Sequence, residues 1–247
     1  MKKDAFGHNL LIKRFLVLTL GALTYPRYRW IHKLKIEGME QLDKLPRQGV
    51  LFVSNHQTYF AEVILLYHLF SAQKHGRKNI KTPFYLLNPI VRFYFIAAVE
   101  TMKSGFLPRL FEYVGSVSIK RTWRAAGKSV NRQVDMNDIS KIGKAIDDGW
   151  VITFPQGTTK AFAPGRRGTA HVVKKFEPIV VPIVLDGFRR GFDKKGLGIK
   201  KRGVNLKVRF KEPMKFNFDD DNDQILHQLM DAIEQTDRFN PEKQFQA

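Results

Sequence analysis

The sequence predicts an α/β fold: one mixed, largely parallel sheet flanked by helices, with a helical segment at the N-terminus. Short apolar runs typical of buried strands alternate along the chain with segments typical of helices. The chain has 247 residues, 43% of them hydrophobic and 12% aromatic, which suits one large domain with a buried core. No repeat or low-complexity linker divides it. We therefore expect an N-terminal membrane-associated helical segment over residues 1–32 and a single α/β domain over residues 33–247.

The N-terminal segment contains an apolar run, residues 10–23, interrupted only by Lys13 and Arg14. A helix that crosses a bilayer needs about 20 apolar residues, so this run is too short, and no small-residue cleavage site follows it. We expect an interfacial helix whose two cations lie among lipid headgroups. Three aromatic residues would then lie at the membrane boundary: Tyr25, Tyr28 and Trp30. The alternative is an ordinary helix packed on the domain.

In the first half of the domain, residues 34–37 and 50–54 are typical of strands. Residues 60–72 predict a helix that is apolar on almost every face, so it must be buried or touch lipid. The remaining elements are a short strand at 83–87, an aromatic-rich stretch at 90–99 that fits either class, a helix at 106–113 and a strand at 114–119.

In the second half, residues 138–148 give the clearest helix prediction. Ile139, Ile142 and Ile146 share one face, Asn137 or Asp138 can cap the start, and Gly149 can end the helix. The other predicted elements are strands at 150–154, 179–185 and 204–210 and helices at 170–175 and 222–236.

The charge balance is strongly basic, with 42 Lys and Arg against 23 Asp and Glu and a formal net charge of +19. Such a field attracts either nucleic acid or an anionic membrane. The basic residues lie mostly in predicted loops, whereas a protein that reads a nucleic-acid groove needs them on one helix face. We therefore favour a membrane surface over nucleic acid, with solvated basic loops as the plainer alternative. The chain has no cysteine, which excludes disulfides and a thiolate nucleophile, and we predict no metal site.

Two short motifs follow predicted strands. Residues 54–57, Ser-Asn-His-Gln, follow the strand at 50–54, and residues 154–159, Phe-Pro-Gln-Gly-Thr-Thr, end the strand at 150–154 in a Pro-Gly turn. A histidine can take a proton from an alcohol at neutral pH when an acceptor fixes its tautomer. The two strand ends thus offer a base and a tight polar turn, which is typical of an acyl-transfer site on an α/β sheet.

Together with three further blocks, these motifs resemble the glycerolipid acyltransferase family, the lysophosphatidate acyltransferase-like enzymes. The further blocks are residues 115–121, Gly-Ser-Val-Ser-Ile-Lys-Arg, residues 165–168, Gly-Arg-Arg-Gly, and residues 181–183, Val-Pro-Ile. The resemblance implies that His56 is the catalytic base and that a neighbouring carboxylate supports it. It also implies a set of substrate-binding residues: Asn55, Lys120, Arg121, Gln156, Gly157, Thr158, Thr159, Lys160, Arg166, Arg167 and Pro182.

The sequence departs from the family pattern at both main motifs. The family aspartate five positions after the histidine is Ala61 here, and Glu62 follows it. We predict that the longer glutamate side chain restores the contact. In the motif at residues 154–159, Gln156 stands where the family has a glutamate and Thr159 where it has an arginine. Lys160 follows directly. Because arginine binds phosphate in a bidentate manner and lysine acts as a point charge, the change weakens the case for a strict phosphate monoester, and a lysolipid with another head group becomes a serious alternative.

The resemblance implies direct transfer of a fatty acyl group from acyl-CoA or acyl carrier protein to a hydroxyl of a lysolipid, without another cofactor. The acceptor would be a 1-acylglycerol-3-phosphate-like lysophospholipid or another lysolipid, such as a lyso-amino-acid lipid. Backbone amides around Gly157 would stabilise the oxyanion, by about 3 kcal/mol per donor. We expect a monotopic or peripheral protein on the cytoplasmic face of the cell membrane, with an anionic membrane surface as partner and no nucleic acid. The alternatives are an inactive relative that binds lipid or an anionic partner, and a basic nucleic-acid binder.

Overall fold

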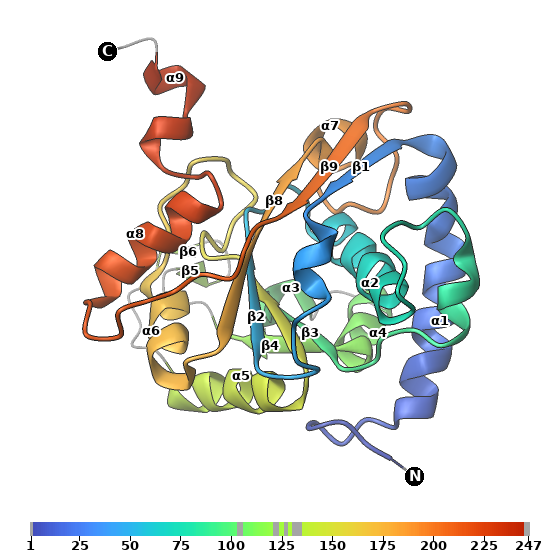
Figure 1. Ribbon diagram of the computed structural model, residues 1–247, viewed down its shortest axis with the longest axis horizontal. Helices are drawn as coiled ribbons and strands as arrows, with labels where there is room; N and C mark the ends of the chain where they lie inside the picture. The colour runs from blue at the N-terminus through green and yellow to red at the C-terminus, as the bar shows by residue number, and fades with distance from the viewer. Residues whose placement is uncertain (1, 103–105, 121–123, 126–127, 130–134, 245–247) are drawn as a thin grey trace.

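The computed structural model describes residues 2–102, 106–120, 124–125, 128–129 and 135–244. Its main feature is a seven-stranded sheet with the order β1-β9-β8-β2-β7-β3-β4 (Figure 1). Strands β8, β2, β7, β3 and β4 run parallel, β9 runs antiparallel to β8, and β1 runs parallel to β9. This confirms the predicted mixed, largely parallel sheet. The strands are β1 Lys33–Glu37, β2 Val50–Ser54, β3 Phe93–Ala98, β4 Ser116–Ile119, β7 Trp150–Thr153, β8 Ile179–Asp186 and β9 Asn205–Phe210, with β5 Arg124–Ala125 and β6 Lys128–Ser129 as a separate antiparallel pair.

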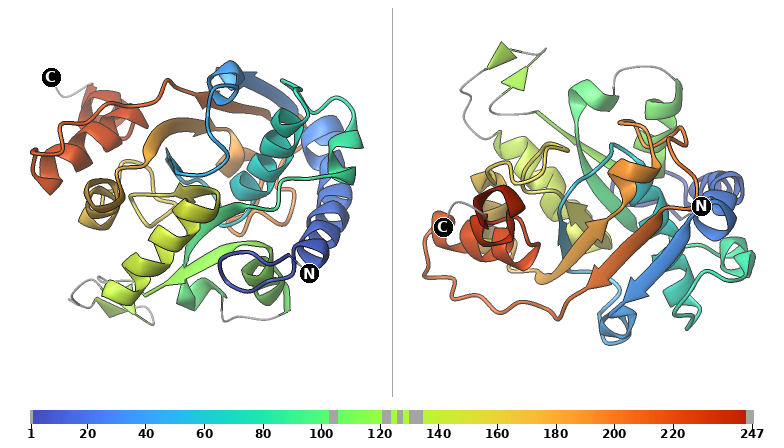
Figure 2. Two further views of the ribbon diagram at one scale, coloured as in Figure 1. Left: turned by 60° about the horizontal axis from the view of Figure 1, so that its bottom comes forward. Right: turned by 90° about the horizontal axis from the view of Figure 1, so that it is seen from above.

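Helices cover both faces of the sheet (Figure 2). Along β2, Val50 and Phe52 contribute to the core that includes residues of α1, α2 and α4, and Leu51 and Val53 to the core beneath α5, α6 and α8. This alternation is the period of two that a strand buried on both faces requires. The helices are α1 Leu10–Pro26, α2 Ala61–Lys74, α3 Val99–Met102, α4 Phe106–Val114, α5 Met136–Asp148, α6 Arg167–Phe176, α7 Phe188–Gly191, α8 Asn222–Ala232 and α9 Pro241–Gln244, with a π-helix η1 Arg27–Ile31 and 3-10 helices η2 Met39–Leu42, η3 Pro83–Leu87 and η4 Asp237–Phe239.

Most predicted elements are present within a few residues of their predicted bounds, and two details are wrong. The stretch predicted as a strand at 83–87 is the 3-10 helix η3, whose first position is a proline that needs no hydrogen-bond acceptor there. Helix α5 is capped by Asp135, whose side chain accepts from the amide of Asn137, so the cap lies before both predicted candidates.

The N-terminal helix α1 packs against α2, α4 and η3, and this corrects the placement predicted for its residues. Lys13 is buried rather than directed to headgroups: its Nζ lies 3.0 Å from Asp4 Oδ2 and 4.3 Å from the centre of the Tyr94 ring. Tyr25 and Tyr28 are also buried, and their hydroxyls donate to backbone carbonyls. Among the described residues, no helix combines the length and apolar character that crossing a membrane requires.

The outer side of α1 carries a surface that we call the α1–η3 face. Its large apolar side chains are exposed although the helix beneath them is packed on the domain. They are Leu11, Ile12, Phe15 and Leu23 of α1, Trp30 of η1, and Phe84 and Leu87 of η3. An exposed group of this kind marks a binding surface more often than a solvated one.

Candidate active site

The site lies where the carboxyl ends of the parallel strands meet. Strands β2 and β7 are direct neighbours, with Val53 opposite Thr153, so the loops that follow them are adjacent, as predicted from the two motifs. A pocket of about 480 Å³ opens between these loops, the ends of β3 and β4, and the starts of α5 and α6. Ligand sites in open α/β sheets are typically at this edge.

His56 forms part of the pocket wall. Its side chain is 14% exposed, and its ring stacks on the ring of Phe154 with centroids 4.0 Å apart and planes at 22°. His56 Nδ1 lies 3.8 Å from Glu62 Oε1, longer than a hydrogen bond but close enough for the carboxylate to attract the ring once the ring is protonated. The predicted histidine and the displaced carboxylate are thus brought together beside the pocket.

Glu62 is completely buried in the first turn of α2. Its Oε1 accepts from the amides of Gln57 and Thr58, each at 2.6 Å, and its Oε2 accepts from the Thr58 hydroxyl. Burial raises the pKa of Glu62 to about 7, although these hydrogen bonds favour the charged form. A carboxyl whose pKa lies near neutrality, next to a histidine in a pocket, has the properties of a functional group.

The segment that carries His56 is fixed to the end of β8. The Asn55 side chain donates to the Leu185 carbonyl at 2.8 Å and accepts from the Leu185 amide at 2.8 Å. The Gln57 side chain donates to the same carbonyl at 3.0 Å and accepts from the amide of Arg189 at 3.2 Å. Asn55 was predicted to bind substrate, but the structure places its side chain in this sheet contact, outside the pocket lining. Its contacts orient the histidine loop.

The turn after β7 closes through a hydrogen bond from the Gly157 amide to the Phe154 carbonyl at 2.9 Å. Gly157 has φ of 60°, a conformation that glycine adopts at low cost. Since this amide is used inside the turn, the oxyanion donors predicted around Gly157 would have to come from the residues that follow. Thr158 and Thr159, which were predicted to bind substrate, line the pocket.

Gln156 was predicted to bind substrate, and the structure places its side chain elsewhere. It is buried, and its amide nitrogen donates to the Ala163 carbonyl at 3.0 Å and to Gln235 Oε1 at 3.1 Å. The side chain therefore joins the turn to the end of the chain after α8, outside the pocket lining. A glutamate has no N–H to donate to these two oxygens, which gives a physical reason for glutamine at this position.

The polar end of the pocket carries both signs of charge. Lys120 lies there, with its amide 2.8 Å from Asp138 Oδ2 and its ammonium 3.4 Å from Asp135 Oδ2, and both aspartates line the pocket. Arg166 and Arg167 also line it, and Arg167 Nε donates to Asp223 at 2.7 Å.

Two further predicted substrate-binding residues, both among the described residues, do not line the pocket. Lys160 is exposed beside the turn. Pro182 is buried in β8 opposite Val53, where it belongs to the sheet. Arg121 lies outside the described residues.

Comparison with known proteins agrees with this geometry. A family model described as "Acyltransferase" matches residues 33–186, which is more than half of the chain. The chain belongs to the acyltransferase family. This confirms the family resemblance drawn from the motifs. The structure is similar to the crystal structure of the 1-acyl-sn-glycerophosphate (LPA) acyltransferase PlsC from Thermotoga maritima, with a TM-score of 0.54 and 17% identity over 89% of this chain and 76% of that one. No curated protein sequence matches the chain significantly.

Three residues of this acyltransferase's site were missed in the sequence: Gln57, Thr58 and Arg189. Thr58 precedes Glu62 by four positions, a spacing at the start of a helix that could have indicated its hydrogen bond. No pattern in the sequence indicated Arg189, because its hydrogen-bond partners, Gln57 and the Thr159 carbonyl, lie far from it along the chain.

Proposed function

We propose that this acyltransferase moves a fatty acyl group from acyl-CoA or acyl carrier protein to a hydroxyl of a lysolipid at a membrane surface. The observation that carries the proposal is the His56 ring on the pocket wall beside the buried Glu62. His56 removes the acceptor hydroxyl proton as the oxygen attacks the thioester carbonyl. Amides of the turn around Thr158 and Thr159 stabilise the oxyanion. When the C–S bond breaks, the thiolate recovers the proton from the imidazolium, which Glu62 stabilises as a carboxylate.

The acyl chain would occupy the apolar side of the pocket. Phe60, Val63 and Phe95 line both the main pocket and a smaller cavity of about 30 Å³ beneath α1. The Phe60 ring stacks on Phe111 with centroids 4.7 Å apart, and Phe111 lines the smaller cavity. Apolar side chains thus extend from the region of His56 toward α1, which suits a fatty acyl chain.

The polar end of the pocket favours an acceptor head group with a carboxylate, such as an amino-acid lipid. Lys120 and Arg167 each already interact with a carboxylate, and Asp135 and Asp138 would repel a doubly charged phosphate monoester. A head group with one negative charge, or with both signs, meets less repulsion. A 1-acylglycerol-3-phosphate acceptor is the second candidate, because the fold matches that of an enzyme named for this substrate.

The α1–η3 face would place the enzyme peripherally on the cytoplasmic face of the membrane. Its exposed side chains include Trp30, which is 71% exposed, and the exposed cations Arg29 and Lys81 lie beside it. Aromatic and aliphatic side chains next to cations bind the interface of an anionic bilayer.

The test combines acyl-CoA and acyl carrier protein donors with a panel of lysolipids that includes lysophosphatidate and lyso-amino-acid lipids. The His56→Ala variant should lose at least about a hundredfold of the turnover, since a general base typically contributes this much. The exposed His227 on α8 provides a matched control, and His227→Ala should keep the wild-type rate. Turnover of His56→Ala at the wild-type rate would exclude the mechanism. Absence of any His56-dependent product would favour an inactive relative that binds lipid.

A further inference from the structure

The loop between α7 and β9 lies directly on the segment that carries the proposed base. The amide of Tyr59 donates to the Lys194 carbonyl and the amide of Phe60 to the Lys195 carbonyl, both at 3.0 Å. Gly196 fits so closely that a side chain there would begin 2.6 Å from the Thr58 hydroxyl oxygen. Because the two lysines make these contacts through their backbones, their exposed side chains remain directed away from the core.

Exposed cations from three segments meet around this contact. Arg189 of α7 bonds through its amide to Gln57 and through its guanidinium to the carbonyl of Thr159, which lines the pocket. Lys160 follows that threonine directly. We call this group the cationic rim: Lys160, Arg189, Lys194 and Lys195. α7 and the loop after β7 both lie in the upper part of the view in Figure 1.

The charge of this region is almost entirely of one sign. Residues 187–210 contain nine Lys and Arg but one acidic residue, Asp193. The Asp193 carboxylate accepts from the Leu197 amide at 2.9 Å and thereby shapes the loop. Among the described residues, no ion pair involves a member of the cationic rim. The rim is therefore a source of positive potential beside the pocket.

The rim differs from the surface proposed to meet the membrane. Exposed large apolar side chains among the described residues lie mainly on the α1–η3 face, and none lies in residues 187–203. A surface that is cationic, polar and spread over several segments fits a folded acidic partner, since charge complementarity guides such encounters. The partner that must reach this pocket is the acyl donor.

We propose that the cationic rim docks an acidic acyl carrier protein, so that its thioester arm enters the pocket past the Thr159 side toward His56. This inference rests on the proposed function and makes the carrier protein, rather than acyl-CoA, the preferred donor. It also gives Lys160, predicted from the sequence to bind substrate, a role outside the pocket as a contact for the donor's protein.

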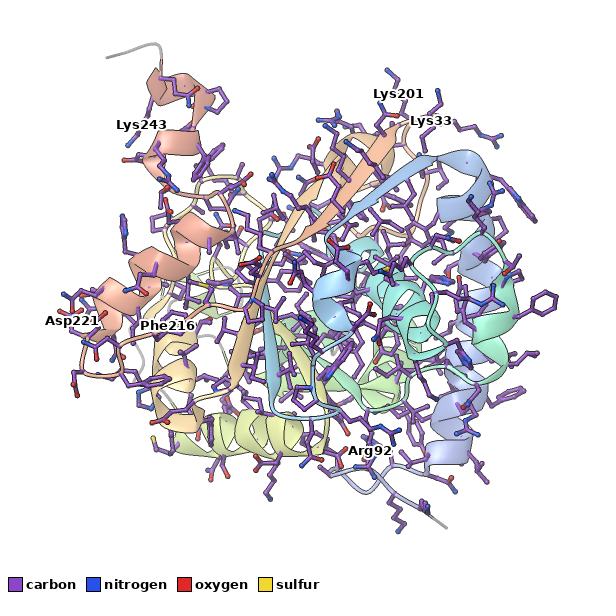
Figure 3. All side chains as sticks on the ribbon, viewed as in Figure 1. Lys33, Arg92, Lys201, Phe216, Asp221 and Lys243 are labelled. Carbon is purple, nitrogen blue, oxygen red and sulfur yellow. The ribbon has the colours of Figure 1, made fainter. Side chains whose placement is uncertain are left out.

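The test reverses charge on the rim and, as a matched control, at the other end of the same loop. The rim variant is Lys194→Glu/Lys195→Glu. The control is Lys200→Glu/Lys201→Glu, which changes the net charge equally at the end of the loop where Lys201 lies beside Lys33 (Figure 3). Transfer to a detergent-solubilised lysolipid is measured with acyl carrier protein and with acyl-CoA as donors, and binding of holo carrier protein is measured directly.

We expect the rim variant to raise the KM for acyl carrier protein by about tenfold, to weaken carrier binding equally, and to leave the KM for acyl-CoA within about twofold. The control should change neither value, and high salt should reduce wild-type carrier binding. Unchanged carrier binding by the rim variant, or an equal rise in KM for both donors, would overturn the proposal. Wild-type protein that binds carrier through the rim but transfers no acyl group would contradict the proposed function and leave the docking surface supported.

Discussion

The carboxylates of Asp4 and Glu62 are both buried beside a basic side chain, and they behave in opposite ways. Asp4 lies 3.0 Å from Lys13, and both side chains are excluded from solvent. Glu62 lies 3.8 Å from His56, which is partly open to the pocket. Burial alone would raise the pKa of Asp4, but the charge of Lys13 and hydrogen bonds from His8 and Phe6 hold it below its ordinary value. Burial raises the pKa of Glu62 to about 7.

The difference separates a structural pair from a reactive one. Asp4 stays charged at neutral pH, so with Lys13 it fixes the N-terminal turn and α1 on the sheet. Glu62 gains or loses a proton close to neutrality, and its ionised form is the one that supports the imidazolium of His56. Burial alone therefore does not show whether a charged group is structural or reactive. Its partner and its access to a pocket decide between these two roles.

The largest expected effect comes from breaking the structural pair. Lys13→Met leaves the buried Asp4 carboxylate with only the partly exposed His8 ring beside it, and the loss of a buried partner costs about 3–5 kcal/mol of unfolding free energy. We expect a matching fall in denaturant midpoint, while turnover per folded molecule stays near the wild-type value.

The control is the double variant Asp4→Asn/Lys13→Met, which removes both charges and should recover most of the lost stability. A Lys13→Met protein as stable as the wild type would show that the pair does not hold α1 in place. A folded Lys13→Met protein with abolished turnover would erase the distinction between the two pairs.

The contrast between the two pairs also shows which features could be predicted from the sequence. Apolar segments of strand and helix length predicted the sheet and most helices, because these patterns lie within short stretches of the chain. The ordered motifs placed His56 beside the turn at 154–159, because each motif directly follows a predicted strand. The burial of Lys13 was not predicted because its partner Asp4 lies in an N-terminal turn that packs on distant residues, with Phe6 on Tyr94 and His8 on Tyr113. Gln156 was assigned to substrate for the same reason, since its partner Gln235 is far along the chain.

A smaller effect is expected from the reactive pair, in both stability and turnover. The folded-state pKa of Glu62 lies above its ordinary value, so its contribution to stability is present below about pH 4.5 and is lost as the pH rises through about 7. Glu62→Gln has no such loss, and it should exceed the wild type in stability by up to about 3 kcal/mol at pH 8. Its turnover at pH 8 should fall about tenfold, because the imidazolium lacks a counter-charge. The gap in turnover should narrow below pH 7, where Glu62 itself becomes neutral.

A second variant tests whether the position of the carboxylate matters. Ala61→Asp/Glu62→Ala restores the family spacing, but Gly196 lies so close that a side chain on it would begin 2.9 Å from the Ala61 Cβ. We expect an aspartate at this position to face the loop that contains Gly196 rather than His56, and turnover to stay at the level of Glu62→Ala. Recovery to the wild-type rate would show that a carboxylate at position 61 can replace the one at position 62.

The smallest expected effect concerns α1, which connects the regions of the two pairs. The Asp4–Lys13 pair fixes this helix, and the helix forms a wall of the small cavity next to the site of His56 and Glu62. Leu20 of α1 lines this cavity, and Leu20→Phe should reduce the space for the end of the acyl chain. Each methylene of the acyl chain that no longer fits in the cavity loses about 0.8 kcal/mol of binding free energy. The ratio of kcat/KM for long over short donors should therefore fall about fourfold per excluded methylene. Leu23→Phe on the exposed side of the same helix is the control and should leave the ratio unchanged. An unchanged ratio in Leu20→Phe would place the chain elsewhere, and α1 would then serve the fold and the membrane but not the choice of donor.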